Sequence, residues 1–458
     1  MNRVRGQLGQ IWADSRAFRI ILILALVYVV LRLAIHGAYL AMMLYPNSGI
    51  MGGMPEWTGA ESEPMVPVDL QVYLDAAENL MKRESLYVQG PITRLEDLYQ
   101  YPPAFALAFV PMAGMSATLV SVLHTLLHIG AYVALYCLWA RIFEDQKLTR
   151  ASRMLALTTP AWLVFSAFWS DLGYLNIYII TAVLGTLLID AILRERLGWA
   201  ILWVSLILQT KPQWAFAAAV PLLTGRRRFF VKLIGGSLLA YGAVIGSTML
   251  LTGPGYALHE YGDYVRFLST LPARFPWRGP EAPYLGYNHS VKQTMIYLFG
   301  DTSAASTLAM AVKLALLAPL GVVGGRYLMQ GLHGDRLYSP SRAIELAFLL
   351  YLGAFIWLDM VWELSLGIAL FTYLLATGEE RWWKGLISAV FIPYALIDLW
   401  QLLSVGLLGM DVMDPGPYIL TDPSIYVPMV MVVILVFYVV LLKHLWSSSS
   451  KGWEASIC

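Results

Sequence analysis

The sequence predicts an all-α polytopic membrane protein, on the strength of its composition and its many long apolar runs. Of 458 residues, 58% are hydrophobic and 13% are charged, whereas a soluble domain carries about 25% charged residues. One soluble core cannot hold so many apolar side chains, while a membrane span needs about 20 largely apolar residues. The near balance of 31 basic and 30 acidic residues argues against a nucleic-acid partner.

The apolar runs predict about 10–12 transmembrane segments. The first run, residues 20–44, is too long for the hydrophobic part of a cleaved signal peptide and is expected to span the membrane. The further predicted spans are residues 116–139, 154–168, 174–193, 229–251, 304–327, 343–358, 362–376, 385–407 and 425–442.

Two apolar stretches do not fit a simple span. Residues 101–115 are short and begin with Tyr101-Pro102-Pro103, and residues 198–223 are split by Lys211-Pro212-Gln213. Proline removes a helical hydrogen bond, and irregular backbone at membrane depth survives only inside protein or beside a water-filled cavity. Residues 198–223 are therefore expected to form a broken intramembrane segment that is interrupted at Lys211.

Charge sets the expected orientation, because Lys and Arg favour the cytoplasmic side. With both termini cytoplasmic, most of the 31 basic residues fall in inner loops. This topology gives long outer loops at 45–100 and 252–303, a shorter one at 409–424 and a cytoplasmic tail at 443–458. Residues 1–458 are expected to form a single integral membrane unit, because no soluble domain or repeat is evident.

The first outer loop is expected to contain an amphipathic helix at the membrane interface. From Val68 onward, apolar residues recur at helical spacing beside polar ones. Asp69 stands where a helix begins, and on local sequence it is interpreted as an N-cap. Asp75 lies about 120° further round the helix, so the two carboxylates do not share a face.

Charged residues within apolar runs need an explanation, since each costs roughly 2.5–3.5 kcal/mol at the bilayer centre. Lys211 has two interpretations: it extends to the surface or pairs with an acid, or its ammonium at the helix break binds an anionic group such as a phosphate. Gln213 would add a donor there. Arg32 and Lys313 are expected to extend outward to the interface.

Other polar residues give weaker indications. In the second outer loop, Asn288, His289 and Lys292 are donors just before a span, and His289 with Lys292 could clamp one phosphate.

Asp359 and Glu363 are interpreted as parts of a solvated turn. The pair at 124 and 128, two histidines on one helical face, is expected to make core hydrogen bonds, because two imidazoles without a third ligand are a weak metal site. No metal or other cofactor is predicted.

Read together, these motifs resemble the polytopic glycosyltransferases of family 87, in the GT-C fold class, which include polyprenyl-phosphate-mannose-dependent mannosyltransferases. Each motif is weak alone, and their order along the chain makes the resemblance specific. The motifs are Val68-Asp69-Leu70-Gln71-Val72-Tyr73, Ala76-Ala77, Leu86-Tyr87, Tyr101-Pro102-Pro103-Ala104-Phe105, residues 173–176, Lys211-Pro212-Gln213 and Asn288-His289-Ser290.

The resemblance implies transfer of a sugar from a polyprenyl-phosphate donor to a lipid or glycan acceptor, with inversion, on the outer face of the cell membrane. It implies that Asp69 is the general base, which outweighs the N-cap interpretation, and that Lys211 lies near the donor phosphate. The substrate-binding set then comprises Tyr101, Lys211, Gln213, Asn288, His289 and Lys292.

One departure from the family pattern concerns residues 362–365. Many members carry a Trp followed closely by His at the start of a later span, but this chain has Trp362-Glu363. If that imidazole binds phosphate in relatives, His289 or Lys292 is expected to replace it here, unless the donor differs.

A secondary transporter is the alternative from another class. Carriers also use broken helices and intramembrane charges, but their sites usually lie between internal repeats, and no two-half symmetry is evident here. Inverting transfer, in contrast, needs a base for the acceptor hydroxyl and positive charge for the departing phosphate. Lys and Arg can supply that charge, so a metal is optional.

Overall fold

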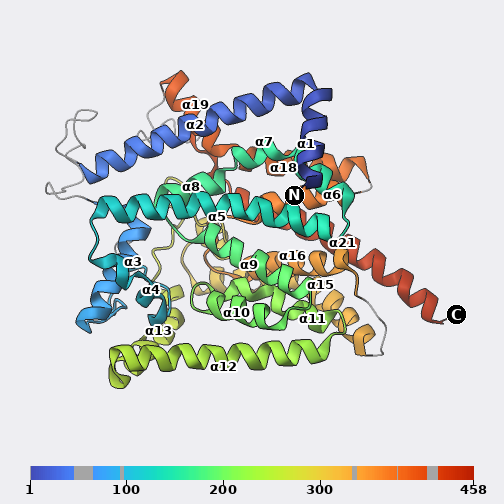
Figure 1. The fold of residues 1–458 in the computed structure, drawn as a ribbon. Helices are drawn as coiled ribbons and strands as arrows, with labels where there is room; N and C mark the ends of the chain where they lie inside the picture. The colour runs from blue at the N-terminus through green and yellow to red at the C-terminus, as the bar shows by residue number, and fades with distance from the viewer. Residues whose placement is uncertain are drawn as a thin grey trace.

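The structure, a computed structural model, describes residues 2–45, 65–92, 97–332, 338–378, 380–409 and 421–457. Within these ranges the chain is helical and has no strand, as the sequence predicts. Parts of the predicted outer loops, 46–64, 93–96 and 410–420, lie outside the described residues. The elements, labelled as in Figure 1, are α1 (Asn2–Asp14), α2 (Arg16–Leu44), α3 (Val68–Lys82), α4 (Pro103–Ala113), α5 (Ala117–Asp145), α6 (Thr149–Leu157), α7 (Thr159–Leu163), α8 (Ser166–Tyr174), α9 (Tyr178–Leu193), α10 (Leu197–Leu208), η4 (Pro212–Ala219), α11 (Val220–Leu223), α12 (Arg227–Thr252), α13 (Pro254–Arg274), α14 (Val291–Phe299), α15 (Ser303–Leu332), α16 (Pro340–Trp357), α17 (Gly367–Thr377), α18 (Arg381–Ala395), α19 (Ile397–Leu408), η5 (Pro423–Ile425) and α21 (Met429–Ile457).

Several helices are long and apolar enough to cross a membrane, which confirms a multi-pass membrane protein. Among the described residues there are six such helices, α2, α5, α12, α15, α16 and α21, and up to eight spans if two bent pairs each count as one. The pairs are the segment Thr159–Tyr174 with α9, bent by 118°, and α18 with α19, bent by 50°. Shorter apolar helices, α4, α10 and α17, account for other predicted segments.

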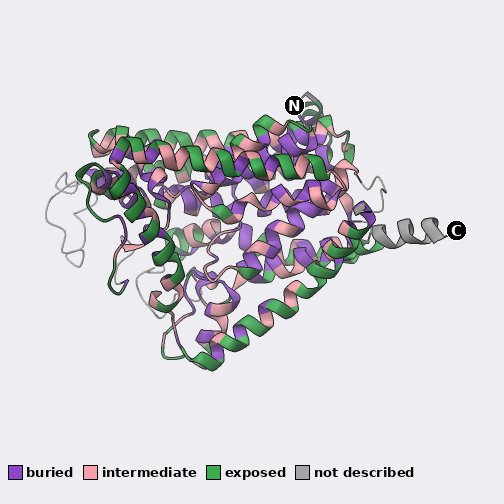
Figure 2. Cartoon of the chain, turned by 90° about the horizontal axis from the view of Figure 1, so that it is seen from below, coloured by how far each residue is buried: buried purple, intermediate pink, exposed green. Residues whose placement is uncertain are grey.

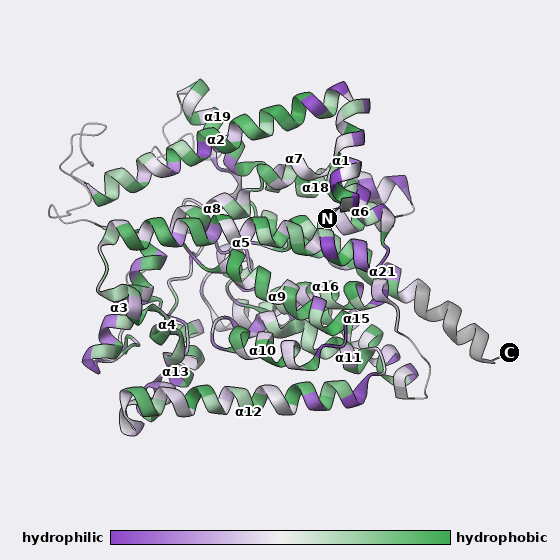
Figure 3. Ribbon diagram, in the orientation of Figure 1, coloured by the Kyte–Doolittle hydropathy of each residue, from purple (hydrophilic) through white to green (hydrophobic). Residues whose placement is uncertain are grey.

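The long helices expose apolar side chains that a soluble protein would bury. Leu239 and Leu250 of α12 are 78% and 87% exposed, and only 11% of the apolar stretch of α12 is buried. Figure 3 shows much of the α12 ribbon coloured as hydrophobic, and Figure 2 shows many exposed residues on the outer helices. Lipid is the medium that suits such a surface. In contrast, 67% of the α16 stretch is buried.

The long helices share two ends (Figure 1). Helices α3, α4 and α13 gather at the end where α2 finishes and α5 begins, whereas α1, α6 and the C-terminal part of α21 lie toward the other end. α3 packs on α4 and contacts α8, α8 contacts α9, and α9 packs on η4. These contacts connect the amphipathic helix with the interrupted segment through the middle of the molecule.

One predicted break is confirmed, and two predicted spans differ in their details. The 198–223 stretch is broken at Lys211, as predicted, between α10 and η4. The predicted span 154–168 is interrupted between α6 and α7, where Pro160 in the first turn of α7 cannot donate a helical hydrogen bond. The predicted span 362–376 becomes helical only at Gly367, and residues 358–366 form a loop.

The two predicted outward-extending cations are instead paired inside the protein. The Arg32 guanidinium donates to both oxygens of Asp398, at 2.7 and 2.9 Å. Lys313 is 2% exposed, pairs with Asp359 and donates to the Trp357 carbonyl at 2.7 Å. The expectation for both residues was wrong, because each meets an acid distant in sequence that makes extension to the surface unnecessary.

Candidate active site

Helix α3 brings Asp69 into the protein at its first turn. Pro67 is the N-cap of this helix and the end has no side-chain cap, so the N-cap interpretation of Asp69 is wrong. The predicted amphipathic pattern is confirmed by buried Leu70 and Tyr73, although Met81 near the end of the helix is 53% exposed. Asp69 is half-buried, and its position in the first turn suits a negative charge.

Asn176 holds the Asp69 carboxylate. Its Nδ2 donates to Asp69 Oδ2 at 2.9 Å. Its Oδ1 accepts from the Ile177 backbone N–H at 2.6 Å and from the Tyr73 hydroxyl at 3.2 Å. Asn176 occupies the bend between α8 and α9, directly after Leu175, whose φ of 52° is left-handed. That conformation costs a leucine about 1–2 kcal/mol, so neighbouring contacts must hold the bend.

A buried carboxylate and a histidine supply those contacts. Asp171 accepts hydrogen bonds from the Tyr178 and Ile179 N–H groups at 3.1 and 3.0 Å, which satisfies the start of α9. His128 Nε2 lies 3.3 Å from Asp171 and also contacts the Asn176 carbonyl. The prediction of core hydrogen bonds is confirmed for His128. His124, buried beside it, has no hydrogen-bond partner among the described residues.

Lys211 lies at the break between α10 and η4, in extended backbone with φ −127° and ψ 91°. Its Nζ is 3.3 Å from the centroid of the Tyr178 ring and 5.6 Å from that of Tyr101. The charges of Asp69 and Asp171 act on it, but the described residues give it no ion pair. Aromatic faces therefore hold the ammonium, and its charge remains available to an anion.

The surroundings set the basicity of Asp69. Burial raises its pKa to about 6, while the Asn176 hydrogen bond and the Lys211 charge lower it and the Asp171 charge adds to the rise. A carboxyl with this pKa is mostly ionised at pH 7 and is a stronger base than an ordinary aspartate.

The aromatic wall beside this carboxylate includes Tyr101. Its ring stacks on Phe105 with centroids 4.3 Å apart, and its hydroxyl lies 3.2 Å from that of Tyr73. Gln213 lies two residues after Lys211, in the first turn of η4, and is half-buried. The structure thus brings Asp69, Tyr101 and Lys211 into one site, with Gln213 on the adjoining element.

The other predicted binding residues gather around the 358–366 loop. The Asn288 amide donates to the Asp359 carbonyl at 3.0 Å and accepts from the Val361 N–H at 3.1 Å. The His289 N–H donates to the Val361 carbonyl at 2.7 Å. Lys292 Nζ lies 3.3 Å from the Asp359 carboxylate. We call Asn288, His289 and Lys292 the 288–292 cluster.

The protein itself uses most of the polar groups of the 288–292 cluster, and the Nε2 of His289, which is buried, is left without a hydrogen-bond partner among the described residues. Burial lowers the pKa of His289 to about 4, so its imidazole is neutral at pH 7, and its Nδ1 accepts from the Val430 N–H at 3.1 Å. The Asp359 carboxylate pairs with Lys292 as well as Lys313. The expected solvated turn at Asp359 is therefore wrong.

Sequence reasoning also missed Glu363 as a site neighbour. It is half-buried and accepts a hydrogen bond from the Tyr394 hydroxyl at 2.8 Å. Burial raises its pKa to about 7, and the charges of Asp171 and Asp422 add to the rise. The sequence did contain a signal for Glu363, because Trp362-Glu363 departs from the Trp and His of the family pattern. However, two acidic residues in a short connection, here Asp359 and Glu363, are also typical of a solvated turn.

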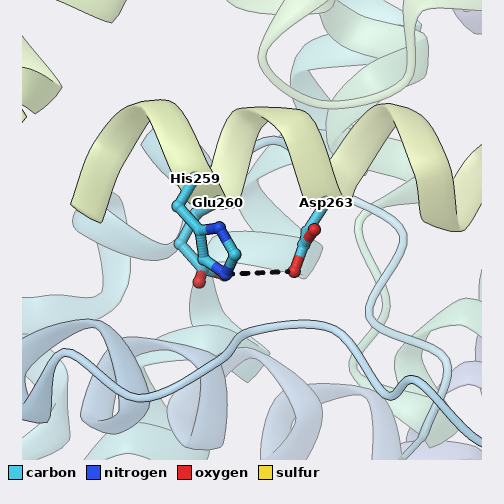
Figure 4. Close-up of side chains that lie close together, drawn as sticks. All are labelled: His259, Glu260 and Asp263. Atoms are coloured by element: carbon cyan, nitrogen blue, oxygen red, sulfur yellow. Dashed lines mark ion pairs between the residues drawn. The ribbon is translucent and has the colours of Figure 1, made fainter. Parts of the chain in front are cut away.

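A separate cluster on α13 serves the packing of the segment after α3. His259, Glu260 and Asp263 approach one another closely enough to hold a metal ion (Figure 4). Two of these groups are already engaged, because Glu260 accepts from the Leu86 N–H at 2.9 Å and Asp263 from the Gln89 amide at 3.0 Å. This cluster attaches α13 to Leu86 and Gln89.

Comparison with known proteins identifies the family. A model of glycosyltransferase family 87 matches residues 99–377, more than half of the chain. The matched range includes Asn176, Lys211 and Glu363, whereas Asp69 precedes it. No curated protein and no solved structure matches the chain. The protein belongs to glycosyltransferase family 87, and it is a membrane glycosyltransferase.

Proposed function

We propose that this protein moves a hexose, mannose or a similar sugar, from a polyprenyl-phosphate donor to a lipid or glycan acceptor, with inversion, on the outer face of the cell membrane. The observation that carries the proposal is that one site contains both a carboxylate that can act as a base and a cation that can bind a phosphate. A half-buried carboxylate, Asp69, is held for proton transfer, and Lys211 lies beside it on two aromatic rings.

The proposed chemistry uses each group once. Asp69 takes the proton of the acceptor hydroxyl, and the acceptor oxygen forms a bond to the anomeric carbon from the face opposite the phosphate. The bond between the anomeric carbon and the phosphate oxygen breaks, and its electron pair leaves with the polyprenyl phosphate. Lys211 stabilises the charge that develops there, and Tyr101 and Gln213 line the binding site.

A lipid-linked donor suits the location of these residues. α3 lies at one end of the long exposed helices (Figure 1), and the charge of its Asp69 acts on Lys211 at the break. A donor whose tail lies in the bilayer can present its phosphate at such a depth. We assign this end to the outer face, because the cytoplasmic side is expected to carry the basic loops.

The 288–292 cluster has a narrower proposed role. Its donors hold residues 359–361, and Glu363 follows two residues later. We propose that Asn288, His289 and Lys292 shape the substrate site by holding this loop in position and do not bind the phosphate directly.

The test is transfer by the purified protein in detergent, supplied with a panel of polyprenyl-phosphate sugars and, separately, nucleotide sugars. We expect product with a polyprenyl-phosphate hexose, and with mannose before other sugars. Product from nucleotide sugars alone would contradict the proposed donor. The transporter alternative predicts substrate flux in sealed vesicles and no glycosidic product in detergent.

A further inference from the structure

The amide of Asn176 has a fixed direction. Its Oδ1 accepts from the Ile177 N–H, which can only donate and so requires the carbonyl oxygen, and it also accepts from the Tyr73 hydroxyl. The NH₂ end must then face Asp69, where Nδ2 donates at 2.9 Å. Two contacts independent of Asp69 therefore orient the donor toward the carboxylate.

The two oxygens of Asp69 are consequently unequal. Asn176 binds Oδ2, and among the described residues it is the only hydrogen-bond partner of this carboxylate. Oδ1 is left for an incoming group. We infer that Asn176 is a positioning residue of the transferase site, which holds Asp69 Oδ2 so that Oδ1 accepts the proton of the acceptor hydroxyl. This inference rests on the proposed function.

Several ionisable groups influence the same carboxylate, and their effects are separable from that of the neutral amide. Asp171 and Lys211 act on Asp69 through their charges. Substitution of Asn176 leaves all these groups in place. The tyrosines whose hydroxyls are influenced by the Asp69 charge are Tyr73, Tyr101, Tyr174 and Tyr178.

The test is the pH dependence of kcat/KM for sugar transfer. A hydrogen bond to the ionised form favours that form, so Asn176→Ala should raise the pKa of Asp69. Because the base must be ionised, the acid limb of the profile should move to higher pH, by about 1 unit for a lost hydrogen bond to a charged group. Tyr73→Phe removes one of the two contacts that orient the amide, while the Ile177 N–H contact remains, and should give a smaller shift in the same direction.

A matched control lies on the exposed face of α3. There Gln71 Nε2 donates to Asp75 at 2.6 Å, so Gln71→Ala removes the same kind of amide–carboxylate bond and should shift nothing. An unchanged acid limb in Asn176→Ala would overturn the inference. If that variant does not fold, an unchanged limb in Tyr73→Phe would overturn it. Survival of the acid limb in Asp69→Asn would instead contradict the proposed function.

Discussion

The site around Asp69 and the 288–292 cluster both contain polar groups that the sequence suggested for substrate binding, but they use those groups differently. Lys211 rests on aromatic rings without an ion pair among the described residues, and one oxygen of Asp69 is unoccupied there. Asn288 and Lys292 instead bind the protein's own loop at Asp359 and Val361. Residue type suggested both regions for substrate binding. They differ because the charged groups of the 288–292 cluster are already paired within the protein, whereas those of the Asp69 site are not, among the described residues.

The largest effect should follow removal of the carboxylate. Asp69→Asn keeps the size of the side chain and removes its basicity, so transfer should fall by roughly a hundredfold or more. Asp75→Asn is the control, because Asp75 is exposed on the same helix and bonded to Gln71. Steady-state turnover of the two folded variants would check this. An equal loss of turnover in both variants would contradict the assignment of Asp69, and not Asp75, as the base.

The next largest effect concerns Lys211. Lys211→Met keeps most of the apolar stem of the side chain and removes its charge. The loss of one charge-assisted contact with phosphate is worth about 1.5–3 kcal/mol and should lower kcat/KM about ten- to a hundredfold. Lys82→Met is the control, since Lys82 forms an exposed pair with Glu78. Kinetics at varied donor concentration would decide. Unchanged donor dependence would show that Lys211 does not bind the phosphate.

The wild-type enzyme should lose activity in acid because of Asp69. Burial raises the pKa of Asp69 to about 6, and protonation removes the base, so kcat/KM should fall about tenfold per pH unit below that value. A pH series with folding monitored in parallel would test this. A profile that stays flat down to pH 4 would exclude a base of this kind.

The smallest effect on turnover is expected in the 288–292 cluster. Asn288→Ala removes bonds to Asp359, Ser290 and Val361, which should lower stability by about 1–3 kcal/mol. We expect a reduced melting temperature and less than threefold change in donor KM, measured on the same preparation. A tenfold rise in donor KM with unchanged melting temperature would return Asn288 to direct substrate binding.

Features formed by residues close together in the sequence could be predicted, whereas contacts between residues far apart in the sequence could not. Local pattern identified α3, the break at Lys211 and the multi-pass class. The pairs Arg32–Asp398 and Lys313–Asp359 join residues 366 and 46 positions apart, and no local pattern contains such contacts. For the same reason, sequence order suggested a role for Asp69 but did not reveal its partner Asn176, which is 107 positions away.

The most direct test of the account compares donor binding with turnover in one variant. Asp69→Asn should bind a polyprenyl-phosphate hexose with nearly wild-type affinity, because Lys211 and the rings of Tyr101 and Tyr178 are intact. Transfer in the same preparation should be almost lost. Equilibrium binding of a labelled donor, followed by addition of acceptor, measures both. A parallel loss of binding and transfer would contradict the assignment of Asp69 as the general base.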